Sequence, residues 1–378
     1  MSAEDLATIF KASARAQRRS RINAALLRGM AGDLEAGGLM VALLKDITDG
    51  AASDGQLLLT AELPARLTTA VHAVALRGQN PIAEVYPSVG GHGALHEVWP
   101  VARAVMTEQP TLFASIALQP NRRSEPARAA MLWAALAYLG AQHSEPVRLF
   151  DVGSGAGLVL AFDSYQQQIF GEQIGDPQSP VDLGHVWRTP PDVDFAAVPP
   201  IVNRRACDAL PGNPANPQYV RELVAYLAPD VPEQIARLTA ACQYVAHQQL
   251  QVDKSLASTW LPRGISWPRA DAQSVIWHSD LVLSMTVPER TEFASQLLAA
   301  ASRATDTAPF TTISFEPVGA DVLLYQDPVG AAVRSGELQI NPNEYELRIN
   351  RWPEATSTVL ASAEPNGESA SWLLSAPA

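Results

Sequence analysis

The sequence predicts an α/β protein in which a helical N-terminal domain precedes a mostly parallel β-sheet that ends in antiparallel strands. Three observations support this prediction. Apolar residues recur at three- and four-residue spacing up to about residue 144. Beyond residue 145, short β-branched runs alternate with helical stretches, which is typical of parallel sheets. The last runs alternate apolar and polar residues, as antiparallel strands at a sheet edge do. We therefore expect domains at 1–144 and 145–378.

The composition is that of a globular protein, with 47% hydrophobic and 17% charged residues. The net charge of -12 opposes binding to phosphate backbones or anionic membranes. Cys207 and Cys242 do not form a CxxC pair, so neither a disulfide framework nor a thiolate zinc site is expected. No segment resembles a signal peptide or approaches the ~18 apolar residues that span a bilayer. We expect a cytoplasmic protein without nucleic-acid or membrane partners.

The helical domain is expected to contain several amphipathic helices that are punctuated by Gly and Pro. The basic cluster RAQRRSR at 15–21 is interpreted as a solvated helix face. The predicted helical segments are INAALLRGM, GLMVALLKDI, LPARLTTAVHAVALRG, VWPVARAVMTEQPTLFASIAL and RAAMLWAALAYLGAQ.

The second domain is expected to contain five strands of a parallel sheet, joined largely by helices. The strands are predicted at 147–153, 200–210, 250–256, 272–282 and 310–318. Helices are expected within 217–248 and 288–302. A hairpin insertion around 166–190 is expected to turn at its GDP sequence. The antiparallel strands are YELRINRWP, STVLASAEP and SASWLLS.

A glycine-rich turn follows the first predicted strand, in the sequence RLFDVGSGAGLVLAFDSY. Gly153, Gly155 and Gly157 form G-x-G-x-G, whereas a dinucleotide site needs G-x-G-x-x-G, and Leu158 occupies the last of those positions. No Gly-Lys-Ser/Thr follows, as a nucleotide-triphosphate loop requires. The carboxylate of Asp151 would repel a pyrophosphate but attract a ligand that bears an ammonium and a sulfonium. The alternative is a tight turn that needs glycine only for packing.

The pattern D-x-G-x-G-x-G after an apolar strand resembles motif I of class I methyltransferases. The resemblance implies that S-adenosylmethionine binds at Asp151, the three glycines and Ser154, and leaves as S-adenosylhomocysteine. It also implies one acid that ends the second strand and holds the ribose, and another after the third strand that meets the adenine amine. Asp208 and Asp253 suit these roles, or each caps the next helix. Asp208 lies 57 residues beyond Asp151, so the hairpin insertion must absorb the excess over the ~20 of a simple βαβ unit.

The segment VIWHSDL falls where the fourth strand should end, at the carboxyl edge where open α/β sheets bind ligands. His278 is the candidate general base, because an imidazole titrates near neutrality. Asp280 either orients His278 or acts as the base itself. Trp277 is a candidate cofactor contact. In the alternative interpretation, His278 caps the following turn and Trp277 fills the core.

The sequence PNRRSEPAR is a candidate wall of the substrate site, through Asn121, Glu125 and Arg128. Alternatively, Glu125 and Arg128 form an ordinary ion pair on one helical face. His92 and His96 have the i, i+4 spacing that zinc can use, but the H-E-x-x-H order is absent, so no metal site is expected.

In this order, the motifs resemble a bacterial family called domain of unknown function 2332. The resemblance covers nearly the whole chain and implies a helical region joined to a methyltransferase-like Rossmann core, without indicating a substrate. Members commonly carry Thr and Val where this chain has Pro120 and Arg123, and often lack part of the glycine motif that this chain keeps. The motifs are NAALLRGMAGD, LRGQNPIAEVYPS, QPNRRSEPARAA, LFDVGSGAGLVL, GDPQSPV, RRACDALPGNP, VIWHSDLVLSM, LRINRWP and ASAEPNG.

The leading functional hypothesis is S-adenosylmethionine-dependent methyl transfer to a small molecule, with residues 1–144 shaping the acceptor pocket. The second is a non-catalytic protein whose methyltransferase-like core binds a small ligand. The third is a nicotinamide-dependent reductase. These hypotheses differ in whether the protein binds the sulfonium compound or NADH, and in whether bound cofactor is turned over.

Overall fold

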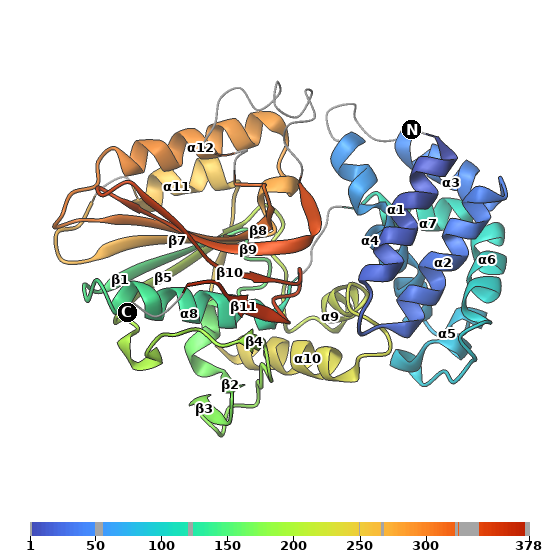
Figure 1. Cartoon of the computed structure of the whole chain (residues 1–378), viewed down its shortest axis with the longest axis horizontal. Coiled ribbons are helices and arrows are strands. Elements are labelled where there is room, and N and C mark those ends of the chain that lie inside the picture. Colours follow the sequence, from blue (N-terminus) through green and yellow to red (C-terminus); the bar gives the residue numbers. More distant parts are fainter. Residues whose placement is uncertain are drawn as a thin grey trace. The chain divides into compact units, whose positions relative to one another are not determined.

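The computed structural model describes residues 2–49, 56–119, 124–248, 250–265, 268–321, 324 and 340–374 (Figure 1). The chain divides into two compact units. The helical unit comprises Met1–Arg123 and Asn216–Thr239, and the sheet unit comprises Ser124–Ala215 and Ala240–Ala378.

This division differs from the predicted boundary at residue 144. Helix α8 (Ala129–Gly140) belongs to the sheet unit, and ten of its twelve residues are buried. A helix that is apolar on every side must be enclosed by other elements, and periodicity alone does not say by which. The segment 216–239, which lies between two strands in sequence, belongs to the helical unit for a similar reason, because α9 (Pro217–Val224) buries an apolar face there.

The helical unit is held by one continuous apolar core that draws on most of its helices. Serine side chains cap two of them, since Ser2 and Ser20 accept hydrogen bonds from backbone N–H groups in the first turns of α1 and α2. Among the described residues before Val147, every regular element is helical, as predicted. The helices are α1 (Ala3–Ala16), α2 (Arg21–Glu35), α3 (Leu39–Asp49), α4 (Gln56–Ala75), α5 (Pro81–Val85), α6 (Val98–Glu108), α7 (Pro110–Ala117), α9 (Pro217–Val224) and α10 (Pro232–His247), which runs past residue 239.

The sheet unit contains a large mixed sheet, which confirms the predicted α/β fold. Within the described residues its strand order is β4-β11-β10-β9-β8-β7-β1-β5-β6. Strands β6, β5, β1, β7 and β8 are parallel, and β9, β10 and β11 follow in antiparallel pairs. The strands are β1 (Val147–Val152), β4 (Trp187–Thr189), β5 (Ile201–Asp208), β6 (Val252–Lys254), β7 (Gln273–Ser279), β8 (Phe310–Val318), β9 (Asn341–Trp352), β10 (Thr356–Ala363) and β11 (Ala370–Trp372).

Helices cover both faces of this sheet. Figure 1 shows α11 (Ala257–Ile265) and α12 (Val287–Ala301) over one face and α8 over the other. On the first face, Phe150, Ile276 and Phe293 belong to one apolar cluster with α11 and α12. Helix α11 was not predicted from the sequence.

The predicted hairpin insertion is present, but its turn is elsewhere. Strands β2 (Gln166–Ile169) and β3 (Glu172–Gly175) pair antiparallel around Phe170 and Gly171, whose φ angles are 48° and 92°. Two consecutive positive φ values are those of a type I′ turn, which suits a two-residue hairpin. The GDP sequence begins at Gly175, the last residue of the second strand, so the predicted turn was wrong. The stronger glycine–proline signal lies at the exit of the hairpin.

Candidate functional site

The candidate site lies where strand order reverses at the carboxyl edge of the parallel strands. Strand β1 lies between β5 and β7, and Val152 is in register with Cys207 on one side and His278 on the other. In open α/β sheets, ligands bind in the crevice at such a switch point. The arrangement brings together the glycine turn after β1, the end of β5 and the loop after β7.

The glycine turn requires glycine at each of its three motif positions. Gly153, Gly155 and Gly157 have φ angles of 76°, 60° and 77°, in the left-handed region that other residues rarely adopt. A Cβ atom at Gly153 would also lie 2.8 Å from the Leu281 side chain, so the loop after β7 lies against the turn. Backbone conformation therefore explains the glycines, and their presence alone does not indicate a ligand. A short 3-10 helix, η4 (Val159–Ser164), follows the turn.

Three backbone donors of the turn are already used by the protein. The N–H groups of Gly153 and Ser154 both donate to the carbonyl of Cys207, at 3.0 and 3.1 Å. The N–H of Gly155 donates to Asp208 Oδ2 at 2.9 Å. Phosphate-binding turns present such groups to their ligand. In this protein the same N–H groups already donate to protein acceptors. They are therefore not available to bind a phosphate.

Asp151 lies beneath the turn and is only 2% exposed. Its Oδ2 accepts a hydrogen bond from Ser154 Oγ at 2.5 Å. Burial raises the pKa of Asp151 to about 7, and the nearby charge of Asp208 acts in the same direction. The hydrogen bond from Ser154 opposes this rise. Asp151 therefore changes its charge close to neutral pH.

The pKa of Asp151 predicts a pH dependence of stability. The folded protein holds this proton up to about pH 7, whereas an unfolded chain releases it near pH 4, so stability falls as pH rises between these values. We expect wild type to lose about 2–3 kcal/mol from this group between pH 5 and pH 8. Asp151→Asn should lack that loss in urea denaturation at the two pH values. An equal loss of stability between pH 5 and pH 8 in both proteins would contradict the assignment of this pKa to Asp151.

Asp208 ends β5 and lies beside the turn with a half-buried side chain. Its Oδ1 accepts from the N–H of Leu210 at 2.7 Å, and its Oδ2 accepts from Gly155. It does not cap the next helix, because Asn216 is the N-cap of α9. The structure thus places a carboxylate at the end of the second parallel strand, where the sequence predicted the ribose contact.

The side chains of Asp253 and Asp208 lie on opposite faces of the sheet. It is in register with Cys207, whereas Lys254 is in register with Asp208, and neighbouring side chains on a strand point to opposite faces. The Oδ2 of Asp253 accepts from Trp260 Nε1 at 2.7 Å and from Arg205 at 2.9 Å. These two hydrogen bonds lower the pKa of Asp253.

His278 is fully buried and bonded to a residue that the sequence reasoning missed. Its Nδ1 lies 2.8 Å from Glu316 Oε1, and Glu316 also accepts from the N–H groups of Leu281 and Val282, at 3.0 and 3.4 Å. Nε2 of His278 has no hydrogen-bond partner. The pair thus fastens the loop after β7 to the end of β8. In the sequence, Glu316 could have been recognised as the single acidic residue within the apolar run FTTISFEPV.

The two members of this pair influence each other's protonation. Burial disfavours the charged form of His278, but the hydrogen bond and charge of Glu316 outweigh it and raise the pKa of His278. Burial raises the pKa of Glu316. Both shifts favour the protonated form of the pair.

His278 and Asp151 lie on opposite faces of the sheet. Asp151 is in register with Trp277, and His278 with Val152, so the alternation of side chains separates them. Trp277 is 1% exposed and packs in the core. Of the two predicted catalytic residues, His278 is thus enclosed away from the face that carries Asp151.

Asp280 belongs to a second polar cluster. Its φ of 55° breaks the strand alternation, so Ser279 and Asp280 both reach Arg128. Asp280 accepts from the Tyr345 hydroxyl at 2.6 Å and from Arg128 Nη2 at 3.3 Å, and Ser279 Oγ lies 3.4 Å from Arg128 Nη1. Arg128 also donates to the carbonyl of Pro365, at 2.7 and 3.0 Å. Tyr345 was not predicted.

The structure describes only some of the residues of the predicted wall of the substrate site. Arg128 ends the short 3-10 helix η3 (Pro126–Arg128), directly before α8, and its side chain is buried. Its ion pair is with Asp280. Glu125 is also buried. Asn121 lies outside the described residues.

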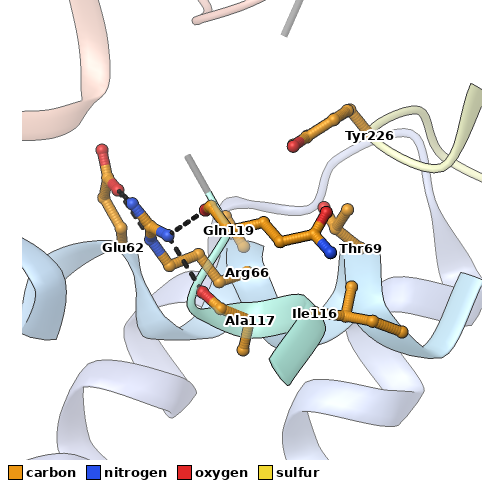
Figure 2. Close-up of a pocket in the computed structure, with 8 residues that line it drawn as sticks. Glu62, Arg66, Thr69, Ile116, Ala117, Gln119 and Tyr226 are labelled. Carbon is orange, nitrogen blue, oxygen red and sulfur yellow. Dashed lines mark hydrogen bonds and ion pairs between the residues drawn. The ribbon is translucent and has the colours of Figure 1, made fainter. Parts of the chain in front are cut away.

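A small pocket in the helical unit is not a site for a nucleoside. Figure 2 shows Arg66 between Glu62, with which it forms an ion pair, and the carbonyls of Ala117 and Gln119, to which it donates at 2.9 and 2.7 Å. The space for water-sized molecules is about 20 Å³, which is close to what one water needs. Arg66 thus ties the end of α7 to α4.

The fold and the site define an α/β protein with a Rossmann-like sheet and an acidic glycine turn at its switch point. The chain belongs to the family described as uncharacterized protein conserved in bacteria (DUF2332), whose sequence profile matches residues 7–372. The searches of curated proteins and of solved structures return no match. Across the described ranges, no helix is both long and apolar enough to cross a membrane. Those same ranges hold no group of three His, Cys, Asp or Glu side chains arranged to bind a metal ion.

Proposed function

We propose that this protein binds S-adenosylmethionine at the glycine turn and transfers its methyl group to a small-molecule acceptor. The observation that carries the proposal is the chemistry of the turn. Its N–H groups at Gly153, Ser154 and Gly155 are used by the protein, while the carboxylates of Asp151 and Asp208 flank it. Such a turn favours a ligand with positive charge and hydroxyl groups over a phosphorylated one.

Each end of the cofactor has a matching group. Asp208 is half-buried and presents a carboxylate to the ribose hydroxyls, which are hydrogen-bond donors. Asp151 supplies negative charge beneath the turn for the ammonium and the sulfonium. For Asp253 to meet the adenine amine, as predicted, its carboxylate would share the oxygens that now accept from Trp260 and Arg205. When bound, the cofactor supplies a methyl group that its sulfonium already activates.

On the acceptor side, Asp280 is better placed than His278 to take a proton. His278 is 0% exposed and lies on the face opposite Asp151. Asp280 lies in the loop beside Gly153, and Tyr345 and Arg128 fix its carboxylate. A general base must come within hydrogen-bond reach of the proton that it removes. In this proposal Asp280 accepts the proton of a hydroxyl acceptor, and the His278–Glu316 pair positions the loop.

Isothermal titration with S-adenosylhomocysteine at pH 6 and pH 8 tests this proposal. Asp151 is mostly protonated at pH 6 and mostly ionised at pH 8. The ammonium should therefore bind about tenfold more tightly at pH 8, with uptake of the cofactor releasing a proton. Absence of binding at millimolar ligand would remove the proposal. Binding that does not change with pH would mean that Asp151 is not the partner of the ammonium.

The enclosure of His278 favours a second candidate, a protein that binds the cofactor without turning it over. The two candidates are separated by methyl transfer from radiolabelled S-adenosylmethionine in extracts that contain the native acceptor. Labelled product supports the enzyme. Tight binding without any labelled product supports the non-catalytic protein.

A further inference from the structure

A serine and a histidine of the helical unit form a hydrogen-bonded pair that the proposed function does not use. Oγ of Ser88, in the 3-10 helix η2 (Pro87–Val89), lies 2.8 Å from Nε2 of His72 in α4. Nδ1 of the same imidazole lies 3.0 Å from the carbonyl of Leu227, in the segment between α9 and α10. A hydroxyl, an imidazole and a third group that orients the imidazole thus stand in line, which is the arrangement of activated nucleophiles.

The chemistry of the partners fixes the direction of each hydrogen bond. A carbonyl only accepts, so Nδ1 of His72 carries the hydrogen that faces Leu227. Burial lowers the pKa of His72 to about 4, so the ring is neutral at physiological pH and Nε2 has a free lone pair. The Ser88 hydroxyl therefore donates to Nε2. This is the tautomer in which an imidazole acts as a base toward a serine.

Of the two residues, Ser88 is the more exposed. His72 is 1% exposed, whereas Ser88 is half-buried. A ligand that approaches from solvent therefore meets the serine before the histidine. A groove with a volume of about 570 Å³ begins at the residue after Ser88. It is open to solvent, and polar and apolar residues both line it. Its lining residues are Gln79, Asn80, Pro81, Ala83, Glu84, Val89, Gly90, Gly91 and His92.

We propose that Ser88 is a nucleophile assisted by His72, and that it takes an acyl group from a small ester that lies in this groove. Ser88 Oγ bonds to the carbonyl carbon as its proton moves to Nε2 of His72. The bond from that carbon to the ester oxygen then breaks, and the proton passes from Nε2 to the departing alcohol. Water releases the acid from the acyl-serine by the same path. This inference is independent of the cofactor site.

The surroundings of His72 indicate a slow reaction. Its low pKa makes it a weak base, and the neutral Leu227 carbonyl stabilises an imidazolium less than a carboxylate would. Covalent labelling detects such a serine better than substrate turnover does. An alkyl fluorophosphonate is a suitable probe, because Oγ displaces fluoride from phosphorus in one step while His72 takes the proton.

The test is to incubate the full chain with the fluorophosphonate at pH 7 and to locate the adduct by peptide mass spectrometry. We expect the adduct on Ser88 and its loss in Ser88→Ala. Ser115→Ala should keep full labelling, because Ser115 is an exposed helical serine that donates to the carbonyl of Leu112. No adduct on Ser88, or equal labelling of Ser88 and Ser115, would overturn the proposal.

The pH dependence of labelling tests the role of His72 without a substitution that could unfold the protein. The titratable groups that act on His72 and its ring are Asp230 and Tyr86, and burial keeps the pKa of Tyr86 far above neutrality. His72 therefore stays neutral from pH 6 to pH 8, and labelling should proceed at a constant rate. A serine without a base would label about tenfold faster for each pH unit, as its alkoxide fraction grows. Such a rise at Ser88 would exclude assistance by His72.

Discussion

Replacing Glu316 with alanine is expected to lower the free energy of unfolding by about 3–5 kcal/mol, the usual cost of breaking a buried polar pair. Glu316 and His278 are both fully buried. The substitution leaves the imidazole without its partner and also frees the N–H groups of Leu281 and Val282. Urea denaturation followed by tryptophan fluorescence measures the effect.

A matched control removes an acid from an exposed ion pair in the same unit. The side chains of Arg269 and Asp271 are 56% and 67% exposed. Asp271→Ala should therefore leave the free energy of unfolding almost unchanged. If Glu316→Ala were no more destabilising than Asp271→Ala, the His278–Glu316 pair would not be what holds the loop after β7.

Replacing Asp208 with asparagine is expected to weaken the binding of S-adenosylhomocysteine about 10- to 100-fold. A hydrogen bond to a charged group contributes about 1.5–3 kcal/mol, and the ribose hydroxyls would lose the charge that they donate to. Asparagine keeps the shape of the side chain and one oxygen that can accept from Gly155 or Leu210. The other N–H group loses its acceptor, so a loss of affinity reports on the ligand when urea denaturation shows an unchanged free energy of unfolding.

The control for this variant is Asp163→Asn. Asp163 follows the glycine turn in η4 and forms an ion pair with Arg204, away from the carboxyl edge of the sheet. The affinity of the Asp163→Asn variant for S-adenosylhomocysteine should equal that of wild type. Unchanged affinity in Asp208→Asn, or equal losses in both variants, would show that Asp208 does not hold the ribose.

Much of the sheet could be predicted from sequence, because each parallel strand is a short β-branched run that ends at polar or glycine-containing loops. The position of Asp208 followed from the same pattern, since it ends the second such run. It could not be predicted which of the two units contains α8. Its nearly uniform apolar surface, from Ala129 to Leu139, says that it is enclosed but not which core encloses it.

The parts of the site that could not be predicted depend on strand register. Sequence spacing brings His278 and Asp253 to the carboxyl edge, but only register shows that His278 faces away from Asp151 and that Asp253 pairs with Cys207. A shift of one residue exchanges the faces of a strand. Glu316 and Tyr345 were missed for a related reason, because their partners lie 38 and 65 residues away in the chain.

The proposed function requires that carboxylates beside a turn whose N–H groups at Gly153, Ser154 and Gly155 already donate to the protein select a positively charged nucleoside over a phosphorylated one. Parallel isothermal titrations of the full chain with S-adenosylhomocysteine and with NADH at pH 8 test it most directly. We expect binding of S-adenosylhomocysteine and none of NADH at the same concentrations. Binding of NADH without binding of S-adenosylhomocysteine would contradict it and indicate a nicotinamide-dependent enzyme instead.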